Sequence, residues 1–272
     1  MVVFPNGKIN LGLYITGKRP DGYHNLETVF LPVPIRDALE ILPLKDGTED
    51  VFTLTGLPVE GDTTGNLCLK AVRLIREHHP SIPFLRIHLH KVIPMGAGLG
   101  GGSADGAFTL SLLNKLFRIG LTADQLKAYA LQLGSDCPFF IDNVPSYAEG
   151  RGELLAPVQI DLSSFTLVLV NPRIHVSTAL AFAGITPSPA PVRLQEIIAQ
   201  PVRTWKDQLH NDFEDHVFEK FPEIAAVKAQ LYQAGATYAA MSGTGSTVFG
   251  LFESAPELKM PENYLVLQMK LS

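Results

Sequence analysis

Six glycines fall within the thirteen residues 94–106, which read PMGAGLGGGSADG. They follow a stretch at 84–92 in which apolar and polar residues alternate, a pattern typical of a half-buried strand. The end of the segment 94–106 overlaps residues 104–117, which are mostly apolar and for which we expect a buried helix. Uncovered backbone N–H groups at the positive end of a helix dipole bind anions. The segment therefore predicts a phosphate-binding loop, and a tight turn with close backbone packing is the alternative.

Two common phosphate-binding motifs do not describe this loop. Gly96, Gly98 and Gly101 match the pattern G-x-G-x-x-G, but the region about 20 positions further on predicts a helix start instead of an acidic residue at a strand end. No lysine follows the glycines, as the motif G-x-x-x-x-G-K-[ST] requires. A phosphoryl-transfer site in this chain would therefore take its cation from a metal or from a distant lysine.

Lys8 and Asp136 are the distant candidates. Lys8 lies between a Pro/Gly turn and an apolar strand, and Asp136 lies between a helix end and an expected aromatic strand. Taken singly, Lys8 could be a solvated strand residue and Asp136 part of an Asp turn. Together they suit phosphoryl transfer to an alcohol, because one group must orient the hydroxyl proton and another must hold charge near the phosphoryl group.

Composition argues against several other classes of function. The chain has 272 residues and a net charge of −5, so it lacks the basic surplus of a general nucleic-acid binder. It contains no run of 18 apolar residues and no basic, apolar N-terminal leader, so we expect neither a membrane span nor a signal peptide. Cys68 and Cys137 offer neither a disulfide framework nor metal-ligand spacing. A cytoplasmic location is expected.

Hydrophobic periodicity predicts an α+β fold with mixed, largely antiparallel sheets and packed helices. Thr122 and Gln125 have the spacing of a capping box, and Pro222 and Gly235 bracket another helix. A change of character near residue 150 predicts two domains, 1–152 and 153–272. The expected strands cover 8–16, 26–42, 84–92, 165–172 and 263–271, and the expected helices cover 66–79, 104–117, 121–134, 212–220 and 222–234. Residues 184–194 are expected to be a surface connection, and 236–252 to be two strands around a Gly/Ser turn that either lines a site or only turns.

Four segments, in this order along the chain, resemble the GHMP kinases. They are GKINLGLYITGKRPDGYHNLETVF at 7–30, PMGAGLGGGSADGA at 94–107, LGSDCPFF at 133–140 and MSGTGSTVFGLF at 241–252. The resemblance implies an N-terminal domain that binds ATP and a C-terminal domain that helps to hold the substrate. The sequence DGYH within the first segment resembles a member of this family that acts on a cytidyl-linked methylerythritol. It implies transfer of the ATP γ-phosphoryl group, with Mg²⁺, to the 2-hydroxyl of that substrate in non-mevalonate isoprenoid and terpenoid biosynthesis.

The resemblance also implies roles for individual residues, carried over by motif. Lys8 and Asp136 would be the catalytic pair, and Asn66 and Lys70 would lie beside the adenine. The residues implied at the cytidyl substrate are Asn10, Tyr23, His24 and Phe182. Those implied at the nucleotide phosphates are Pro94, Met95, Gly96, Ala97, Gly98, Leu99, Gly100, Gly101, Gly102 and Ser103. The sequence identifies no metal ligands.

Two other functions stay open at this point. The first is a GHMP kinase with another substrate, such as homoserine or mevalonate, against which the sequence DGYH argues. The second is a catalytically silent relative that keeps only the phosphate loop, against which the presence of both Lys8 and Asp136 argues. We expect small-molecule partners only, with no nucleic acid and no membrane, and a monomer or weak homodimer.

Overall fold

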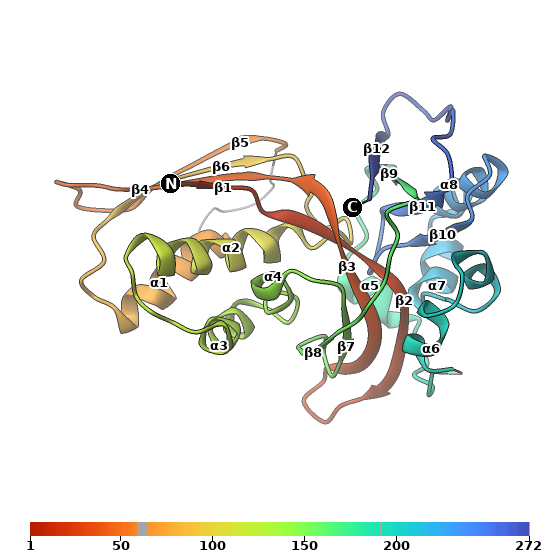
Figure 1. Ribbon diagram of the computed structural model, residues 1–272, viewed down its shortest axis with the longest axis horizontal. Coiled ribbons are helices and arrows are strands. Elements are labelled where there is room, and N and C mark those ends of the chain that lie inside the picture. Colours follow the sequence, from red (N-terminus) through yellow and green to blue (C-terminus); the bar gives the residue numbers. More distant parts are fainter. Residues whose placement is uncertain (59–64, 191, 272) are drawn as a thin grey trace. The chain divides into compact units, whose positions relative to one another are not determined.

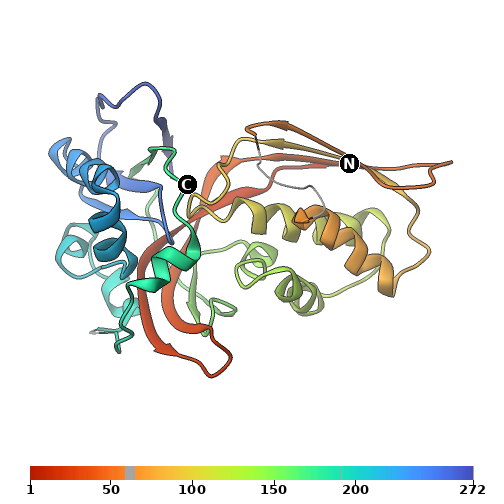
Figure 2. The same cartoon turned by 180° about the vertical axis from the view of Figure 1, so that it is seen from behind.

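The computed structural model describes residues 1–58, 65–190 and 192–271 and divides the chain into two compact units. The first unit is built from Met1–Gly7, Ile35–Met95 and Gly100–Val144, and the second from Lys8–Pro34, Gly96–Leu99 and Pro145–Ser272. Figures 1 and 2 show the fold from opposite sides. Its sheets and packed helices confirm the predicted α+β class. The division into 1–152 and 153–272 stays a prediction.

The first unit is a four-stranded sheet with helices on one face (Figures 1 and 2). Its strands are β1 (Val2–Val3), β4 (Ala38–Pro43), β5 (Val51–Gly56) and β6 (Leu85–Lys91), in the order β1-β4-β6-β5. The pairs are antiparallel except β5 with β6, which is parallel. Leu85, Ile87 and Leu89 of β6 are buried, as the alternation predicts, because they face the core of this unit.

The helices of the first unit are α1 (Leu67–His78), α2 (Gly101–Leu116), α3 (Ala123–Leu133) and α4 (Phe139–Asp142). Both hydrogen bonds of the predicted capping box between Thr122 and Gln125 are present at the start of α3. The expected aromatic strand is wrong, because Phe139 and Phe140 begin the short helix α4. Pro138 already has helical dihedral angles, φ −56° and ψ −34°, and has no N–H to donate to a sheet.

The second unit contains two antiparallel sheets. The first consists of β2 (Asn6–Lys18), β3 (His24–Arg36), β7 (Ser146–Glu149) and β8 (Leu154–Pro157), in that order. The second contains β9 (Thr166–Asn171), β10 (Tyr238–Met241), β11 (Val248–Phe252) and β12 (Leu265–Lys270), in the order β10-β11-β9-β12. Residues 26–42 were expected to form one strand, but the strand is interrupted at Asp37. The Asp37 side chain accepts the backbone N–H groups of Val92 and Ile93, a long-range contact that no local pattern reveals.

Helices cover the second sheet of this unit. They are α5 (Thr178–Ala183), α6 (Leu194–Ile198), α7 (Phe213–Lys220) and α8 (Pro222–Gln233), with a 3₁₀ helix at Val202–Asp207. Pro222 is at the start of α8 and Gly235, with φ +93°, follows its end, as predicted. The α8 helix packs on β10 and β11 and closes a core that includes Val168, Val248 and Leu231. Residue 191 of the surface connection expected at 184–194 lies outside the described residues, and Leu194 already belongs to α6.

Candidate active site

The first unit contains both ends of the glycine loop. Pro94 and Met95 follow β6, and Gly100 precedes α2 as its N-cap with a left-handed φ of +68°. No side chain caps this helix, so its first N–H groups are available to an anion. Ser103, in the first turn of α2, therefore does not cap the helix. Its hydroxyl hydrogen-bonds to the buried thiol of Cys137 instead.

The middle of the loop, Gly96–Leu99, is part of the second unit and is fixed there by its backbone. The Lys8 N–H donates to the Leu99 carbonyl at 2.9 Å, and the Ser242 hydroxyl donates to the Gly98 carbonyl at 2.8 Å. A Cβ atom on Gly98, which has φ +77°, would lie 1.8 Å from the Ser242 carbonyl oxygen. Only glycine fits at this position, because the obstacle is backbone rather than a flexible side chain.

Lys8 and Asn10 lie side by side on β2, next to this segment. The Lys8 ammonium is buried and donates to Asn10 Oδ1 at 2.7 Å, and it also lies 5.1 Å from the centre of the Phe30 ring. Asn10 Nδ2 donates to Thr28 Oγ1 at 2.9 Å, so the amide orientation is fixed. Ser242 Oγ lies 3.5 Å from Asn10 Oδ1. A buried cation is therefore held on a rigid sheet, beside the loop segment Gly96–Leu99.

The Gly/Ser turn at 241–246 belongs to this site. Sequence reasoning left its role open, and the structure places Ser242 against both Gly98 and Asn10. Asn211 holds the turn, since its Nδ2 donates to the carbonyls of Met241 at 2.7 Å and Gly243 at 2.9 Å. Sequence reasoning missed Asn211, which lies 30 positions upstream in a segment without a motif. It also missed His175, whose ring would lie 3.5 Å from a Cβ on Gly96.

Three aromatic residues implied at the substrate lie within the second unit. His24, at the start of β3, stacks on Phe182 of α5 with ring centres 4.8 Å apart and an interplanar angle of 23°. Phe213 packs against the Phe182 ring in an edge contact. Tyr23 is 55% exposed, and the Arg151 guanidinium lies 4.8 Å from its ring centre. The structure therefore brings these rings to one region and pairs Phe182 with His24.

The remaining residues implied by motif lie in the first unit. Asp136 is half-buried in the segment between α3 and α4, and burial raises the pKa of the neighbouring Cys137 thiol to about 12. Asn66 is the N-cap of α1, where its Oδ1 accepts the Cys68 N–H at 2.8 Å. Lys70 is exposed on the first turn of α1. The α1 and α2 helices approach closely at Gly106, because a Cβ there would lie 3.0 Å from Leu67 Cβ.

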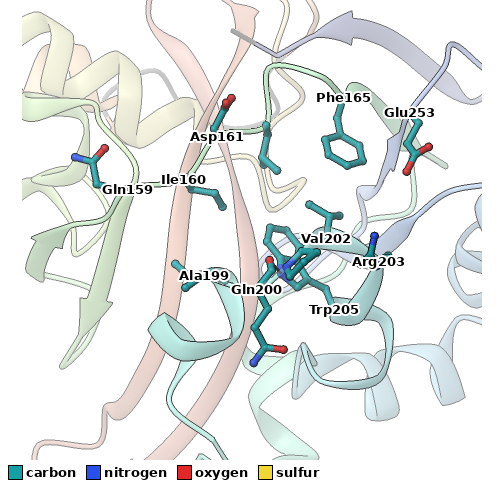
Figure 3. Close-up of a pocket in the computed structure, with 13 residues that line it drawn as sticks. Gln159, Ile160, Asp161, Phe165, Ala199, Gln200, Val202, Arg203, Trp205 and Glu253 are labelled. Carbon is teal, nitrogen blue, oxygen red and sulfur yellow. Dashed lines mark hydrogen bonds between the residues drawn. The ribbon is translucent and has the colours of Figure 1, made fainter.

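A pocket of about 470 Å³ lies elsewhere in the second unit (Figure 3). Trp205, Val202 and Phe165 give it an apolar wall, and Arg203 and Glu253 are among its polar residues. None of the residues implied at the active site lines this pocket, so it is not part of the candidate site.

Within residues 1–58, 65–190 and 192–271, no three His, Cys, Asp or Glu side chains form a group able to hold a metal ion. No helix in the same ranges has the length and apolar character needed to cross a bilayer.

Comparisons with known proteins agree with this architecture. Residues 66–147 match the family model of the GHMP kinases N terminal domain, and residues 194–259 match that of the GHMP kinases C terminal domain. A protein of Bacteroides fragilis named 4-diphosphocytidyl-2-C-methyl-D-erythritol kinase is 52% identical over 261 residues, which cover 96% of this chain and 94% of the relative.

Two solved structures are also similar. A crystal structure of 4-(cytidine 5'-diphospho)-2C-methyl-D-erythritol kinase superposes with a TM-score of 0.79 at 29% identity, over 100% of both chains. The mevalonate kinase of Methanococcus jannaschii superposes with a TM-score of 0.69 at 12% identity, over 100% of this chain and 98% of the other, and at that identity shows the fold alone.

The fold, the two domain matches and the glycine loop define the class as the GHMP kinases. Within that class, the chain belongs to the family of the 4-diphosphocytidyl-2-C-methyl-D-erythritol kinases.

Proposed function

We propose that this protein transfers the γ-phosphoryl group of ATP to the 2-hydroxyl of 4-diphosphocytidyl-2-C-methyl-D-erythritol, a step in non-mevalonate isoprenoid biosynthesis. The observation that carries the proposal is 52% identity over 96% of the chain to a relative that bears the name of this kinase. The buried Lys8 beside the glycine loop supports it, since a silent phosphate binder has no need of a cation held in this way. We further propose that the enzyme is cytoplasmic and acts as a monomer or weak homodimer.

Asp136 and Lys8 have complementary roles in this proposal. The substrate oxygen attacks the γ-phosphorus and the bond to the ADP oxygen breaks, while the hydroxyl proton passes to the Asp136 carboxylate. Lys8 stabilises negative charge at the attacking oxygen. In a loose transition state, positioning by these two groups contributes as much as proton removal.

The nucleotide would be held by the loop and by α1. Gly96–Ser103 would hold the phosphates through backbone N–H groups, with Pro94 and Met95 at the loop entrance and Asn66 and Lys70 beside the adenine. Mg²⁺, when bound, would neutralise part of the phosphate charge. Such an ion takes most of its ligands from phosphates and water, so a site with few protein ligands fits it.

The cytidyl group would bind among Tyr23, His24, Phe182 and Asn10. A cytosine ring needs an aromatic face for stacking and polar groups along its edge. The stacked pair of His24 and Phe182 and the exposed ring of Tyr23 supply both kinds of contact in one unit.

Tyr23→Ala should raise the KM for the cytidyl substrate by roughly 10- to 100-fold, equivalent to about 1.4–2.8 kcal/mol, because a stacking surface is lost. The KM for ATP should change little. Tyr129→Ala is the matched control, since Tyr129 lies on α3 against His78 and outside the proposed sites. Initial rates at varied cytidyl substrate with saturating ATP, and at varied ATP with saturating cytidyl substrate, give the two constants. Impaired ATP use with normal use of the cytidyl substrate would mean that the two subsites are assigned in reverse.

An ADP-release assay tests the proposed function directly. The purified protein is supplied with ATP and Mg²⁺ and, in parallel reactions, with the cytidyl-methylerythritol substrate, mevalonate or homoserine. We expect ADP release with the first acceptor only. Release with mevalonate or homoserine instead would assign another GHMP activity, and no release with any acceptor while ATP still binds would indicate a silent relative.

A further inference from the structure

Three buried charged side chains meet beneath the start of α2, in the first unit. Lys91 ends β6, Asp37 lies between β3 and β4, and Asp105 is in the second turn of α2. Their side chains are 1%, 0% and 4% exposed, respectively. The Lys91 ammonium donates to Asp105 Oδ2 at 2.7 Å and also to Asp37 Oδ2. The catalytic roles proposed above leave this cluster unused.

The cluster ties together both ends of the glycine loop. Asp37 Oδ1 accepts the N–H groups of Val92 at 2.5 Å and Ile93 at 2.9 Å, which are the two residues before Pro94. At the other end, Asp105 anchors α2 to the same ammonium. A Cβ on Gly101, the first residue of α2, would lie 3.3 Å from Lys91 Nζ and 2.8 Å from Ile93 Cγ2. The helix start therefore rests directly on the cluster.

The charges of the cluster do not balance when both carboxyl groups are ionised. One ammonium and two carboxylates leave a net charge of −1 beneath a helix start that is proposed to bind phosphates. Asp105 Oδ1 is buried and has no hydrogen-bond partner among the residues that the structure describes. A buried carboxylate oxygen without a partner is costly, and a proton on it removes the excess charge.

Every titratable group that faces Asp105 is consistent with a proton there. Burial raises the pKa of the Asp105 carboxyl to about 7, against the opposing charge of Lys91 and with the help of Asp37. Although burial works against its charge, Asp105 and Asp37 raise the pKa of the Lys91 ammonium, which stays protonated. Cys68 faces the cluster from α1, and burial raises the pKa of its thiol, which stays neutral.

We propose that Lys91, Asp37 and Asp105 position the phosphate-binding loop and that nucleotide binding favours a proton on the Asp105 carboxyl group. The proposal rests on the phosphate site of the proposed function. A neutral cluster lets the helix start accept the negative phosphates, whereas a cluster with charge −1 opposes them. ATP binding near neutral pH is therefore coupled to uptake of one proton from solvent. Asp105 acts here as a positioning residue, through the loop and not on the reacting atoms.

Asp105→Asn tests the coupling, because asparagine has nearly the shape of the carboxyl group and stays neutral at every pH. The KM for ATP should be similar in the two proteins at pH 6. By pH 8.5 the native KM should exceed that of the variant by about tenfold, whereas kcat at saturating ATP should not follow the same divergence. The ionisation of ATP itself affects both proteins and cancels in the ratio. Parallel pH profiles of KM in the two proteins would overturn the proposal.

Asp50→Asn is the matched control for this experiment. Asp50 is also a carboxylate paired with a cation in the first unit, since it binds Arg76 at 2.7 Å, but it does not contact the loop. This variant should melt at a lower temperature and keep the native pH profile of the KM for ATP. A flattened profile in Asp50→Asn as well would show that loss of stability, not the cluster, flattens it.

Two further measurements keep the test independent of one variant. Calorimetry of ATP binding to the native protein at pH 7.5, in two buffers of different ionisation enthalpy, should report uptake of about half a proton more than Asp105→Asn shows. Thermal melts without nucleotide test the cluster alone. Between about pH 4 and 7 the folded state binds more protons than the unfolded state. The stability of the native protein should therefore fall as the pH rises from 4 to 7, and the fall should be smaller in Asp105→Asn.

The outcomes separate this inference from the proposed function. If ATP does not bind at any pH, the proposed phosphate site fails, and the melts still test the proton on Asp105. If ATP binds to the native protein without extra proton uptake and the two melting profiles coincide, only the cluster proposal fails.

Discussion

Asp136→Asn should lower kcat by about 10²- to 10⁴-fold and leave the affinity for ATP nearly intact. The amide keeps the shape of the carboxylate but cannot accept the hydroxyl proton of the substrate. Single-turnover kinetics at saturating ATP, together with direct measurement of ATP binding, separates the two effects. Asp142→Asn is the matched control, since Asp142 is a carboxylate on the next element, α4, and pairs with Lys127 at 2.5 Å. Full activity in Asp136→Asn would rule out the assigned role.

Lys8→Met extends this prediction to the second member of the pair. Methionine keeps an apolar stem in the buried position of Lys8 beside the Phe30 ring and removes the charge. The loss in kcat should be comparable to that in Asp136→Asn, and the double variant should lose little more than either single variant, because residues that act as a unit are far from additive. Losses that multiply would mean that Lys8 and Asp136 act separately.

Gly98→Ala should have the second large effect, on ATP use and on stability together. The new Cβ would lie 1.8 Å from the Ser242 carbonyl oxygen, so either the loop segment or the turn at 241–246 must move. Displacement of a substrate-positioning segment by about 1 Å costs on the order of 100-fold in activity, and we expect a loss of that size in kcat/KM for ATP. The positive φ and the overpacking together should lower the free energy of unfolding by about 2–5 kcal/mol.

Gly235→Ala separates the two causes. Gly235 also has a positive φ, +93°, but a Cβ there meets nothing within 4 Å. This control should therefore lose only the cost of the left-handed conformation, about 1–2 kcal/mol, and keep its kcat/KM for ATP. Urea titrations of both variants and their kinetics with ATP make the comparison. Equal effects of the two substitutions would mean that the contact between Gly98 and Ser242 has no influence on the loop.

The parts of the fold that could be predicted from sequence are those with a local signal. The α1 helix and the β6 strand follow from periodicity, and the start of α3 follows from the spacing of Thr122 and Gln125. The α5 helix was missed because it has only six residues, although Ser177 caps it through the Leu180 N–H. The N-cap residue Ser177 could have indicated the start of this helix.

The parts that could not be predicted depend on contacts between distant residues. The strand break at Asp37 depends on backbone groups 55 and 56 positions away, and the charge cluster joins Lys91 to that same residue. For the candidate site, the glycine loop and the residues around it came from motif resemblance. Only the structure shows that the 241–246 turn contacts Gly98. The roles of the individual residues remain predictions.

The interleaved order of the two units has a consequence for how the chain is made. A ribosome delivers residues in sequence, at about 5–20 per second, so strand β7 follows the end of β3 after roughly 5–20 s. During this interval β3 lacks its neighbour β7, and only Gly96–Leu99 of the rest of the second unit has been made before Pro145. Val29 and Phe30, which are buried in the finished fold, are among the apolar residues that stay without their final packing during this interval. Assembly of the second unit cannot follow the order of synthesis, and the nascent chain must keep its earliest strands from aggregating until its last ones are translated.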